Sequence, residues 1–217
     1  MGTLLNRRRY MGGVAALPYD ENSYIQDGLV FQLDGINKGT ADGTWTDLKG
    51  GLVFTNYGAV EDANGFTFAN NAYMRIESSF SPNENYTIES SFYCTTKGVV
   101  ISSGGDRKYN LFMNLSDGLF LQHTNKYNYD ITMNSNSIVS VNDSLGYING
   151  RIAQRLSQSD YWGSEGTNIG CSYYGTSRRW FSGKIYAIRV YNRKLTSEEL
   201  LYNQKVDNVR FNLGLTI

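Results

Sequence analysis

The chain has 217 residues, a formal net charge of zero, and 41% apolar and 14% aromatic residues. This length and apolar content suit one domain with a full hydrophobic core. Zero net charge gives no overall field toward nucleic acid or an anionic membrane, and no apolar run approaches the ~18 residues of a membrane span. We therefore expect neither nucleic acid nor a membrane as a partner. Two prolines, 23 glycines and 17 tyrosines favour many short strands joined by glycine and asparagine turns.

The first 27 residues have no hydrophobic periodicity and are expected to form an extended arm. They contain a triple arginine, Arg7, Arg8 and Arg9, followed by Tyr10. The apolar stretch behind these arginines, residues 14–17, is too short for an export signal. We expect a protein that is made and kept in the cytoplasm, or released by lysis within a larger particle.

Short strands are expected from residue 28 onward. Leu29, Phe31 and Leu33 recur with a period of two and give the first strand an apolar face. Trp45 is expected in the core, and Asp34 and Asp47 are interpreted as hydrogen-bond acceptors that close turns. Further strands are predicted over residues 66–68, 73–76, 86–94, 99–102, 109–115, 118–123, 127–133 and 138–142.

The strand predicted over residues 86–94 has one apolar and one polar face. Glu89 and Tyr93 belong to the polar face, which we expect to meet water or a partner subunit. Cys94 and Cys171 have no metal-site spacing, which leaves either one disulfide or two buried thiols, and we favour the thiols.

The last third of the chain carries the clearest local signals. Asn149-Gly150 predicts a type I′ hairpin between two apolar runs. Residues 184–191 are β-branched and aromatic with apolar residues on both faces, which predicts a central strand covered on both sides, or a bulge.

One short helix is predicted after this strand. Thr196 and Glu199 form a capping box, so the helix begins near residue 197 and is expected to end near residue 204. For the apolar residues 206–217 we favour pairing with the sandwich's own edge. The alternative is that they join a neighbouring subunit.

Three motifs in this order resemble the laminin G-like members of the concanavalin A-like lectin and glucanase superfamily. They are Tyr-Ile-Asn-Gly-Arg at 147–151, Phe-x-Gly-x-Ile at 181–185 and Arg-Val-Tyr-Asn-Arg-x-Leu-x-x-Glu-Glu at 189–199. The resemblance covers about residues 28–203. It implies an all-β fold, an antiparallel jelly-roll sandwich of the concanavalin A-like kind over residues 28–217, with one short C-terminal helix and an extended N-terminal arm over residues 1–27.

The superfamily includes glycoside hydrolases, so a catalytic site must be considered. A retaining glycosidase needs two carboxyl groups about 5–5.5 Å apart, hence acidic residues at i and i+4, or i+5 across a bulge, of a strand. Glu89 stands alone in its strand, and Glu61 and Asp62 adjoin. The single histidine, His123, cannot form a metal cluster, and there is no nucleophile motif. We therefore expect a protein that is not an enzyme and that has no catalytic residues.

No cofactor is expected. Calcium is common among laminin G-like domains, but the acidic residues of the expected loops are dispersed and form no dense set of oxygen ligands. These residues are Asp106, Asp117, Asp130, Asp143 and Asp160. A calcium site built from distant loops is left open, and no metal ligand is named.

Sugar binding by such sandwiches uses aromatic side chains beside amides and hydroxyls. The candidate ligand-binding residues are Tyr127, Tyr129, Tyr161, Trp162, Tyr173 and Tyr174. Tyrosine in glycine-rich loops is also the ordinary residue of protein interfaces, and packing or subunit contact is the commoner use of any one of them.

Residues 4–13 resemble the starts of virion proteins from tailed phages of gut bacteria. This resemblance implies a non-enzymatic virion component, such as a capsid decoration, fibre or tail protein, made in the host cytoplasm without a signal peptide. Arg7, Arg8, Arg9 and Tyr10 would anchor the arm to other virion proteins. A homo-oligomer would then hold host or mucus glycans weakly and multivalently. The alternative is a stand-alone bacterial carbohydrate-binding protein.

Overall fold

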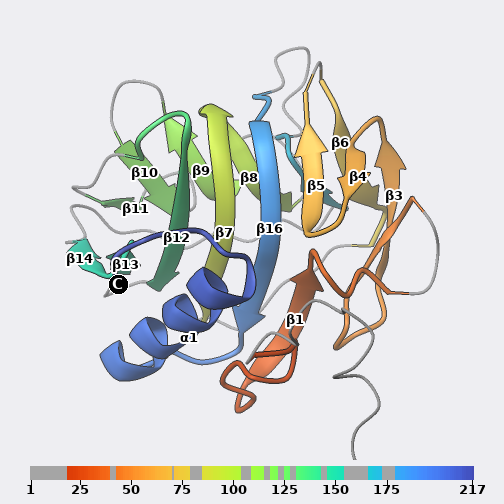
Figure 1. The fold of residues 1–217 in the computed structure, drawn as a ribbon. Coiled ribbons are helices and arrows are strands. Elements are labelled where there is room, and N and C mark those ends of the chain that lie inside the picture. Colours follow the sequence, from red (N-terminus) through yellow and green to blue (C-terminus); the bar gives the residue numbers. More distant parts are fainter. Residues whose placement is uncertain are drawn as a thin grey trace, which may run out of the picture.

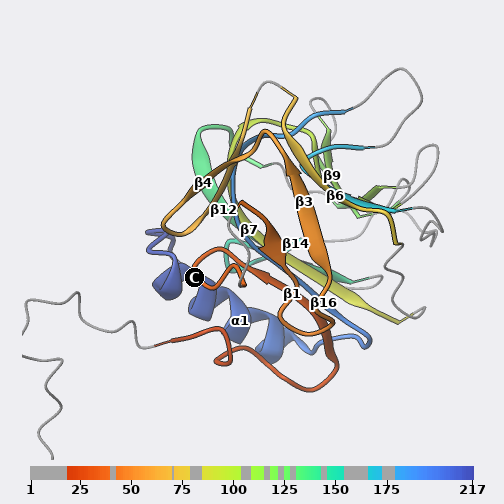
Figure 2. The ribbon, with the colours of Figure 1, turned by 90° about the vertical axis from the view of Figure 1, so that its right-hand side faces the viewer.

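The computed structural model describes residues 19–39, 43–69, 71–78, 85–103, 109–114, 118–121, 125–127, 131–142, 146–153, 166–172 and 179–217, with the side chains of residues 103–127 left out. These residues form two antiparallel sheets stacked as a sandwich, with one helix outside one of them (Figures 1 and 2). The predicted antiparallel β-sandwich is confirmed. Among these residues no helix has the length and apolar content of a membrane span.

The sheet that carries the helix is called the helix-side sheet here. Its strands are Leu29–Asp34 (β1), Val60–Asp62 (β4), Gly65–Phe68 (β5), Thr87–Thr96 (β7), Ser135–Asn142 (β12), Gly146–Ile148 (β13), Arg151–Ala153 (β14) and Ser182–Tyr191 (β16). Their spatial order is β14-β13-β12-β7-β16-β5-β4, and β1 also pairs with β16. The long strands β7 and β16 therefore lie in the middle of this sheet (Figure 1).

The other sheet is called the far sheet. Its strands are Trp45–Thr46 (β2), Val53–Tyr57 (β3), Tyr73–Ile76 (β6), Val99–Ser103 (β8), Tyr109–Asn114 (β9), Gly118–Leu121 (β10), Asn125–Tyr127 (β11) and Thr167–Ile169 (β15). Their order is β11-β10-β9-β8-β15-β6-β3-β2. Figure 2 shows the two sheets as separate layers, with the helix on the outer side of one of them.

The main core lies between the two sheets and is rich in aromatic rings. Trp45 is fully buried with its ring centroid 5.0 Å from that of Phe66, and its indole Nε1 donates to the carbonyl oxygen of Asp34 at 3.0 Å. Burial of each such side chain stabilises the fold by about 1.5–3 kcal/mol. The expected core position of Trp45 is confirmed. Cys94 and Cys171 are buried thiols that are not joined in a disulfide.

The two predicted turn aspartates accept backbone hydrogen bonds, as expected. The Asp47 carboxylate accepts from the backbone N–H of Gln32, Lys49 and Gly50 at 2.8–3.0 Å. Asp34 accepts from the N–H groups of residues 36 and 37 at 2.9 and 2.8 Å. Both aspartates are almost fully buried, so these bonds satisfy carboxylates that burial would otherwise make costly.

The hairpin and the bulge predicted for the last third are both present. Asn149 and Gly150 have φ values of 50° and 76°, as a type I′ turn requires, and join β13 to β14. Strand β16 is central, and its pairing with β7 shifts register between Ile185 and Ala187. Because of this bulge, Ile185 and Ile188 both pack in the core between the sheets, although they are three residues apart.

The helix, Ser197–Arg210 (α1), begins where the capping box predicts. Thr196 Oγ1 accepts from the backbone N–H of Glu199 at 3.3 Å, and Glu199 Oε2 accepts from that of Thr196 at 2.9 Å. The predicted end near residue 204 is wrong, because α1 continues to Arg210. The buried positions recur at helical spacing but are largely polar, so the usual apolar stripe is missing. They are Leu200, Asn203, Gln204, Val206, Asp207 and Arg210.

The polar face of α1 meets the polar face of β7 around Arg189 of β16. Arg189 is fully buried; its Nε lies 3.0 Å from Glu89 Oε2, and its Nη1 and Nη2 donate to the Asp207 carboxylate at 2.8 and 2.7 Å. Tyr24 donates to Asp207 at 2.8 Å, and its ring centroid is 3.9 Å from the guanidinium carbon. These four residues are called the Arg189 cluster. The expectation that Glu89 faces water or a partner subunit is wrong, because α1 covers it.

The Arg189 cluster sets one buried guanidinium against two buried carboxylates. Burial raises the pKa of Glu89, and the adjacent Arg189 guanidinium opposes that rise. Burial acts to lower the pKa of Arg189, but Asp207 and Glu89 raise it well above its ordinary value, so the guanidinium stays charged. Asn203 adds a hydrogen bond from its Nδ2 to Glu89 Oε2 at 2.8 Å.

Residues 19–27, part of the predicted arm, pack on the domain. Besides Tyr24, the backbone N–H of Ile25 donates to Asn203 Oδ1 at 3.0 Å, and Arg210 Nη1 donates to the Tyr19 carbonyl oxygen at 3.1 Å. The predicted anchoring residues Arg7, Arg8, Arg9 and Tyr10 lie outside the described residues.

The C-terminal residues 211–217 lie on the outer face of the helix-side sheet. Phe211 stacks on Tyr186 with 5.6 Å between ring centroids, and Asn136 Nδ2 donates to the Leu213 carbonyl oxygen at 3.0 Å. The prediction that this segment pairs with a sheet edge is wrong. Its apolar side chains instead cover an apolar patch that includes Ile138 and Tyr186.

Removing one carboxylate from the Arg189 cluster is expected to destabilise the fold strongly. Asp207→Ala removes the acceptor of Arg189 Nη1, Arg189 Nη2 and the Tyr24 hydroxyl, all of them buried, so the free energy of unfolding should fall by about 3–5 kcal/mol. Glu61→Gln is the control, because Glu61 is 43% exposed in its ion pair with Lys38, and such pairs contribute about 0–1 kcal/mol. Urea unfolding measures both variants, and equal losses would contradict the assigned role of the cluster.

Candidate functional site: a groove floored by Gly183

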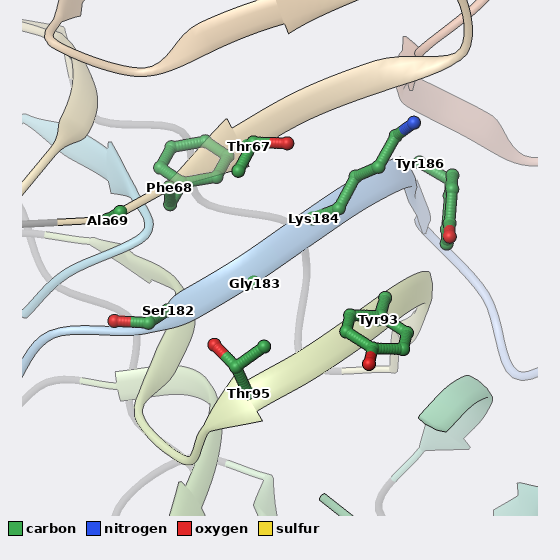
Figure 3. Close-up of a pocket in the computed structure, with 9 residues that line it drawn as sticks. All are labelled: Thr67, Phe68, Ala69, Tyr93, Thr95, Ser182, Gly183, Lys184 and Tyr186. Carbon is green, nitrogen blue, oxygen red and sulfur yellow. The ribbon is translucent and has the colours of Figure 1, made fainter. Parts of the chain in front are cut away.

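A groove with a volume of about 430 Å³ lies on the outer face of the helix-side sheet. It is formed by β5, β7 and β16, and Figure 3 shows the side chains around it. The residues that line it are Thr67, Phe68, Ala69, Tyr93, Thr95, Ser182, Gly183, Lys184 and Tyr186. It is called the Gly183 groove here. Tyr186 also packs against Phe211, so the C-terminal segment borders the groove at one end.

Gly183 explains why the sheet is hollow at this point. Its φ is +138°, and a Cβ at this position would clash with the backbone carbonyl oxygen of Tyr93. The pairing of β16 with β7 also shifts register between Ser182 and Gly183. A glycine within a strand commonly marks such a close approach or bulge. The floor of the groove is therefore bare backbone, flanked by side chains of the neighbouring strands.

The lining combines the aromatic rings of Phe68, Tyr93 and Tyr186 with several hydroxyl groups. Tyr93 and Thr95 come from β7, Thr67 comes from β5, and β16 runs between them (Figure 3). Tyr93 and Thr67 are half-buried, and Thr95 is exposed. Because the lining presents both apolar rings and hydroxyl groups, it suits a ligand that has an apolar C–H surface as well as several hydroxyl groups.

Lys184 stands at one end of the groove with its charge already compensated. Its Nζ lies 2.7 Å from Asp62 Oδ1, donates to Asn64 Oδ1, and lies 5.2 Å from the centroid of the Tyr186 ring. Tyr186 donates to Asn136 Oδ1 at 2.9 Å. Burial, followed by the negative charge of Asp62, raises the pKa of Tyr186, so its hydroxyl keeps its proton at neutral pH.

The residues predicted from the sequence as ligand-binding are not placed in this groove. Tyr127 ends β11 but its side chain is not among those described, and the other five lie outside the described residues: Tyr129, Tyr161, Trp162, Tyr173 and Tyr174. Their role remains a prediction. The groove residues themselves were missed, although the glycine of the Phe-x-Gly-x-Ile motif was a usable signal.

In the described part of the chain, no three histidine, cysteine or acidic side chains lie close enough together to hold a metal ion. His123 and the five dispersed loop aspartates lie outside the described residues. The calcium expectation is therefore untested.

Comparison with known proteins gives matches at the level of structure. No family model and no curated protein matches this chain. A Trypanosoma rangeli sialidase in complex with sialic acid aligns with a TM-score of 0.58 at 11% identity, over 86% of this chain and 33% of that chain. Domain 4 of AbnA, a GH43 extracellular arabinanase from Geobacillus stearothermophilus in complex with arabinotriose, aligns with a TM-score of 0.52 at 13% identity, over 80% of this chain and 96% of that chain.

A third structure, the binding domain of Paraclostridial Mosquitocidal Protein 1, aligns with a TM-score of 0.54 at 13% identity, over 82% of this chain and 52% of that chain. This chain thus spans about a third of the sialidase and most of the arabinanase domain. The likenesses are consistent with a concanavalin A-like sandwich. They lend no support to the narrower laminin G-like assignment or to a phage origin.

The prediction that this protein is not an enzyme is contradicted by the comparison. It rested on the lack of a carboxylate pair in the sequence, yet the same fold forms part of chains that are sialidases. At 11–12% identity this likeness shows the fold alone. The correction is that the sandwich is a fold shared with glycan-cleaving proteins.

Replacing Gly183, which forms the floor of the groove, should lower the stability of the fold. Gly183→Ala adds a clash with backbone to an unfavourable φ, and we expect it to lose about 2–3 kcal/mol more stability than the control Gly214→Ala. Gly214 has a φ of +69°, but a Cβ there would meet nothing within 4 Å. Thermal and urea unfolding of both variants measure the difference. Equal stability would show that the close approach to Tyr93 is not a constraint.

Proposed function

We propose that this domain binds carbohydrate and that the Gly183 groove holds a neutral sugar ring. The observation that carries the proposal is the combination in one groove of the Tyr93 ring, the hydroxyls of Thr67 and Thr95, and a bare glycine floor. A pyranose or furanose ring has C–H groups that pack on an aromatic ring and hydroxyls that exchange hydrogen bonds with threonine.

The size and charge of the groove support a small neutral ligand. Its volume of about 430 Å³ falls in the range of about 300–1,000 Å³ usual for ligand pockets. Lys184 is paired with Asp62 and Asn64, so binding an anionic sugar there would compete with existing interactions. We therefore favour a neutral over an acidic sugar.

The comparisons support the proposal at the level of the fold. The arabinanase domain was solved with arabinotriose, and a sialidase was solved with sialic acid. Because one fold serves many functions, carbohydrate binding by this chain depends on the residues of its own groove.

The test is binding of neutral oligosaccharides, including arabinotriose, first on a glycan array and then by isothermal titration calorimetry. Tyr93→Ala removes the ring, and Thr95→Trp fills the groove from an exposed position. We expect each variant to bind at least about tenfold more weakly, equivalent to about 1.4 kcal/mol. Tyr202→Ala is the control, because Tyr202 is a 41% exposed tyrosine on α1. Unchanged affinity in both groove variants, or no neutral ligand for the unaltered protein, would contradict the proposal.

Membership of a phage particle, docking of the arm through residues 7–10 and homo-oligomerisation are further parts of this proposal. Deleting residues 1–18 is the appropriate test, since it keeps the contacts of Tyr24 and Ile25 with α1. We expect a folded protein that no longer assembles, measured by light scattering and particle incorporation. Deleting residues 1–27 would also remove Tyr24 from the Arg189 cluster and should lower stability. Assembly without residues 1–18 would contradict the anchoring role and favour a stand-alone carbohydrate-binding protein.

A further inference from the structure

A second hollow lies on the far sheet and has a different chemistry. Its volume is about 420 Å³, and β3 and β6 supply much of its lining, including Val53, Thr55, Tyr57 and Arg75. Thr55 is directly opposite Arg75 in the pairing of the two strands, and Tyr57 is directly opposite Tyr73. It is called the Arg75 hollow here.

The guanidinium of Arg75 is held by a residue of the neighbouring strand β15, where Asn168 lies directly opposite Arg75. Its Nη1 donates to Asn168 Oδ1 of β15 at 3.0 Å, and Asn168 is only 1% exposed. The Arg75 side chain itself is 20% exposed. A buried amide therefore fixes the Nη1 side of the guanidinium, and Arg75 is one of the residues that line the hollow.

The Nε and Nη2 side of the guanidinium already holds a carboxylate. Nε and Nη2 donate to Oε1 and Oε2 of Glu77 at 2.8 and 2.9 Å, which is the two-bond geometry that arginine forms with carboxylates. The Glu77 side chain, however, is 81% exposed. Ion pairs with so much solvent access contribute little to stability, so another carboxylate can replace Glu77 at small cost.

An apolar surface lies beside this guanidinium. Tyr57 is 46% exposed, and its ring stacks on Tyr73 with 4.6 Å between centroids and an interplanar angle of 9°, which holds it in place. Tyr57 and Arg75 are diagonal neighbours on adjacent strands, a relation that places side chains about 7–8 Å apart. One sugar ring can therefore contact the tyrosine with its C–H face while its carboxylate reaches the guanidinium.

We propose that the Arg75 hollow is a second glycan site, specific for acidic saccharides of the hexuronate class, in which the ligand carboxylate displaces Glu77 from Arg75. Arg75 is the specificity-determining residue, Tyr57 is the stacking surface, and Asn168 is a positioning residue. The site is on the opposite sheet from the Gly183 groove and does not depend on it. The two differ in charge preference because the partners of Lys184 are half-buried, whereas Glu77, the carboxylate that the ligand would displace from Arg75, is exposed.

The test uses the full chain, a galacturonate trisaccharide and the methyl ester of the same trisaccharide, in isothermal titration calorimetry at low salt. We expect the acid to bind at least about tenfold more tightly than the ester, because the ester cannot form the charged two-bond contact. Arg75→Gln should abolish this preference, and Glu77→Gln should strengthen acid binding because the competing charge is removed. Tyr93→Ala should leave acid binding unchanged, which separates this site from the groove.

Three results would overturn the proposal. They are equal affinity for acid and ester, an acid preference that survives Arg75→Gln, and acetate or sulfate binding as tightly as the trisaccharide. If Arg75→Gln lowers the melting temperature, its loss of binding could come from unfolding. The affinities of Arg75→Lys and Glu77→Gln for the acid then test the proposal in its place. Lysine keeps the positive charge but lacks the two-bond geometry of the guanidinium, so Arg75→Lys should retain only part of the preference for the acid over the ester. Unchanged acid affinity in both of these variants would also overturn the proposal.

Discussion

The buried guanidinium of Arg189 is the interaction on which the outer face of the helix-side sheet depends. It joins three separate parts of the chain: Glu89 of β7, Asp207 of α1 and Tyr24 of the segment before β1. Because α1 is fixed here, the chain after it turns back over β12 and β16, where Phe211 packs on Tyr186. Tyr186, which lines the Gly183 groove, is thereby linked through Phe211 and α1 to the Arg189 cluster on the same sheet.

Burying such a cluster costs folding free energy unless its charged groups form hydrogen bonds with one another. Taking a guanidinium and two carboxylates out of water carries a penalty of several kcal/mol per ion. Here Asp207 meets Arg189 with both carboxylate oxygens, while Asn203 and Arg189 share Glu89 Oε2. Arg210 repeats the arrangement at the end of α1, donating to both oxygens of buried Asp34 at 3.0 and 2.9 Å. The helix is therefore held by directional polar contacts, which specify its position more narrowly than apolar packing would.

Local signals in the sequence predicted the local structure well. The capping box at Thr196 and the Asn149-Gly150 turn depend on neighbouring residues, and both are confirmed. The buried Trp45 and the two turn aspartates are also confirmed, although some of their contacts are with residues farther along the chain. The end of α1 could not be predicted, because its buried face is polar and is defined only by partners about 20 to 180 residues away. The groove could not be predicted either, because it requires a bulge and three strands from distant parts of the chain. The glycine within the strand, Gly183, was the one local sequence signal of the groove.

Mapping amide chemical shifts on the isotopically labelled full chain during titration with a neutral oligosaccharide tests whether sugar binds in the Gly183 groove. The account predicts that the largest changes occur at the backbone amides of Thr67, Thr95 and Gly183, which lie on the three strands of the groove. It also predicts that the amides of β3 and β6 stay unchanged. Changes confined to the far sheet, or to residues away from both sheets, would contradict the assignment of the Gly183 groove as the sugar site.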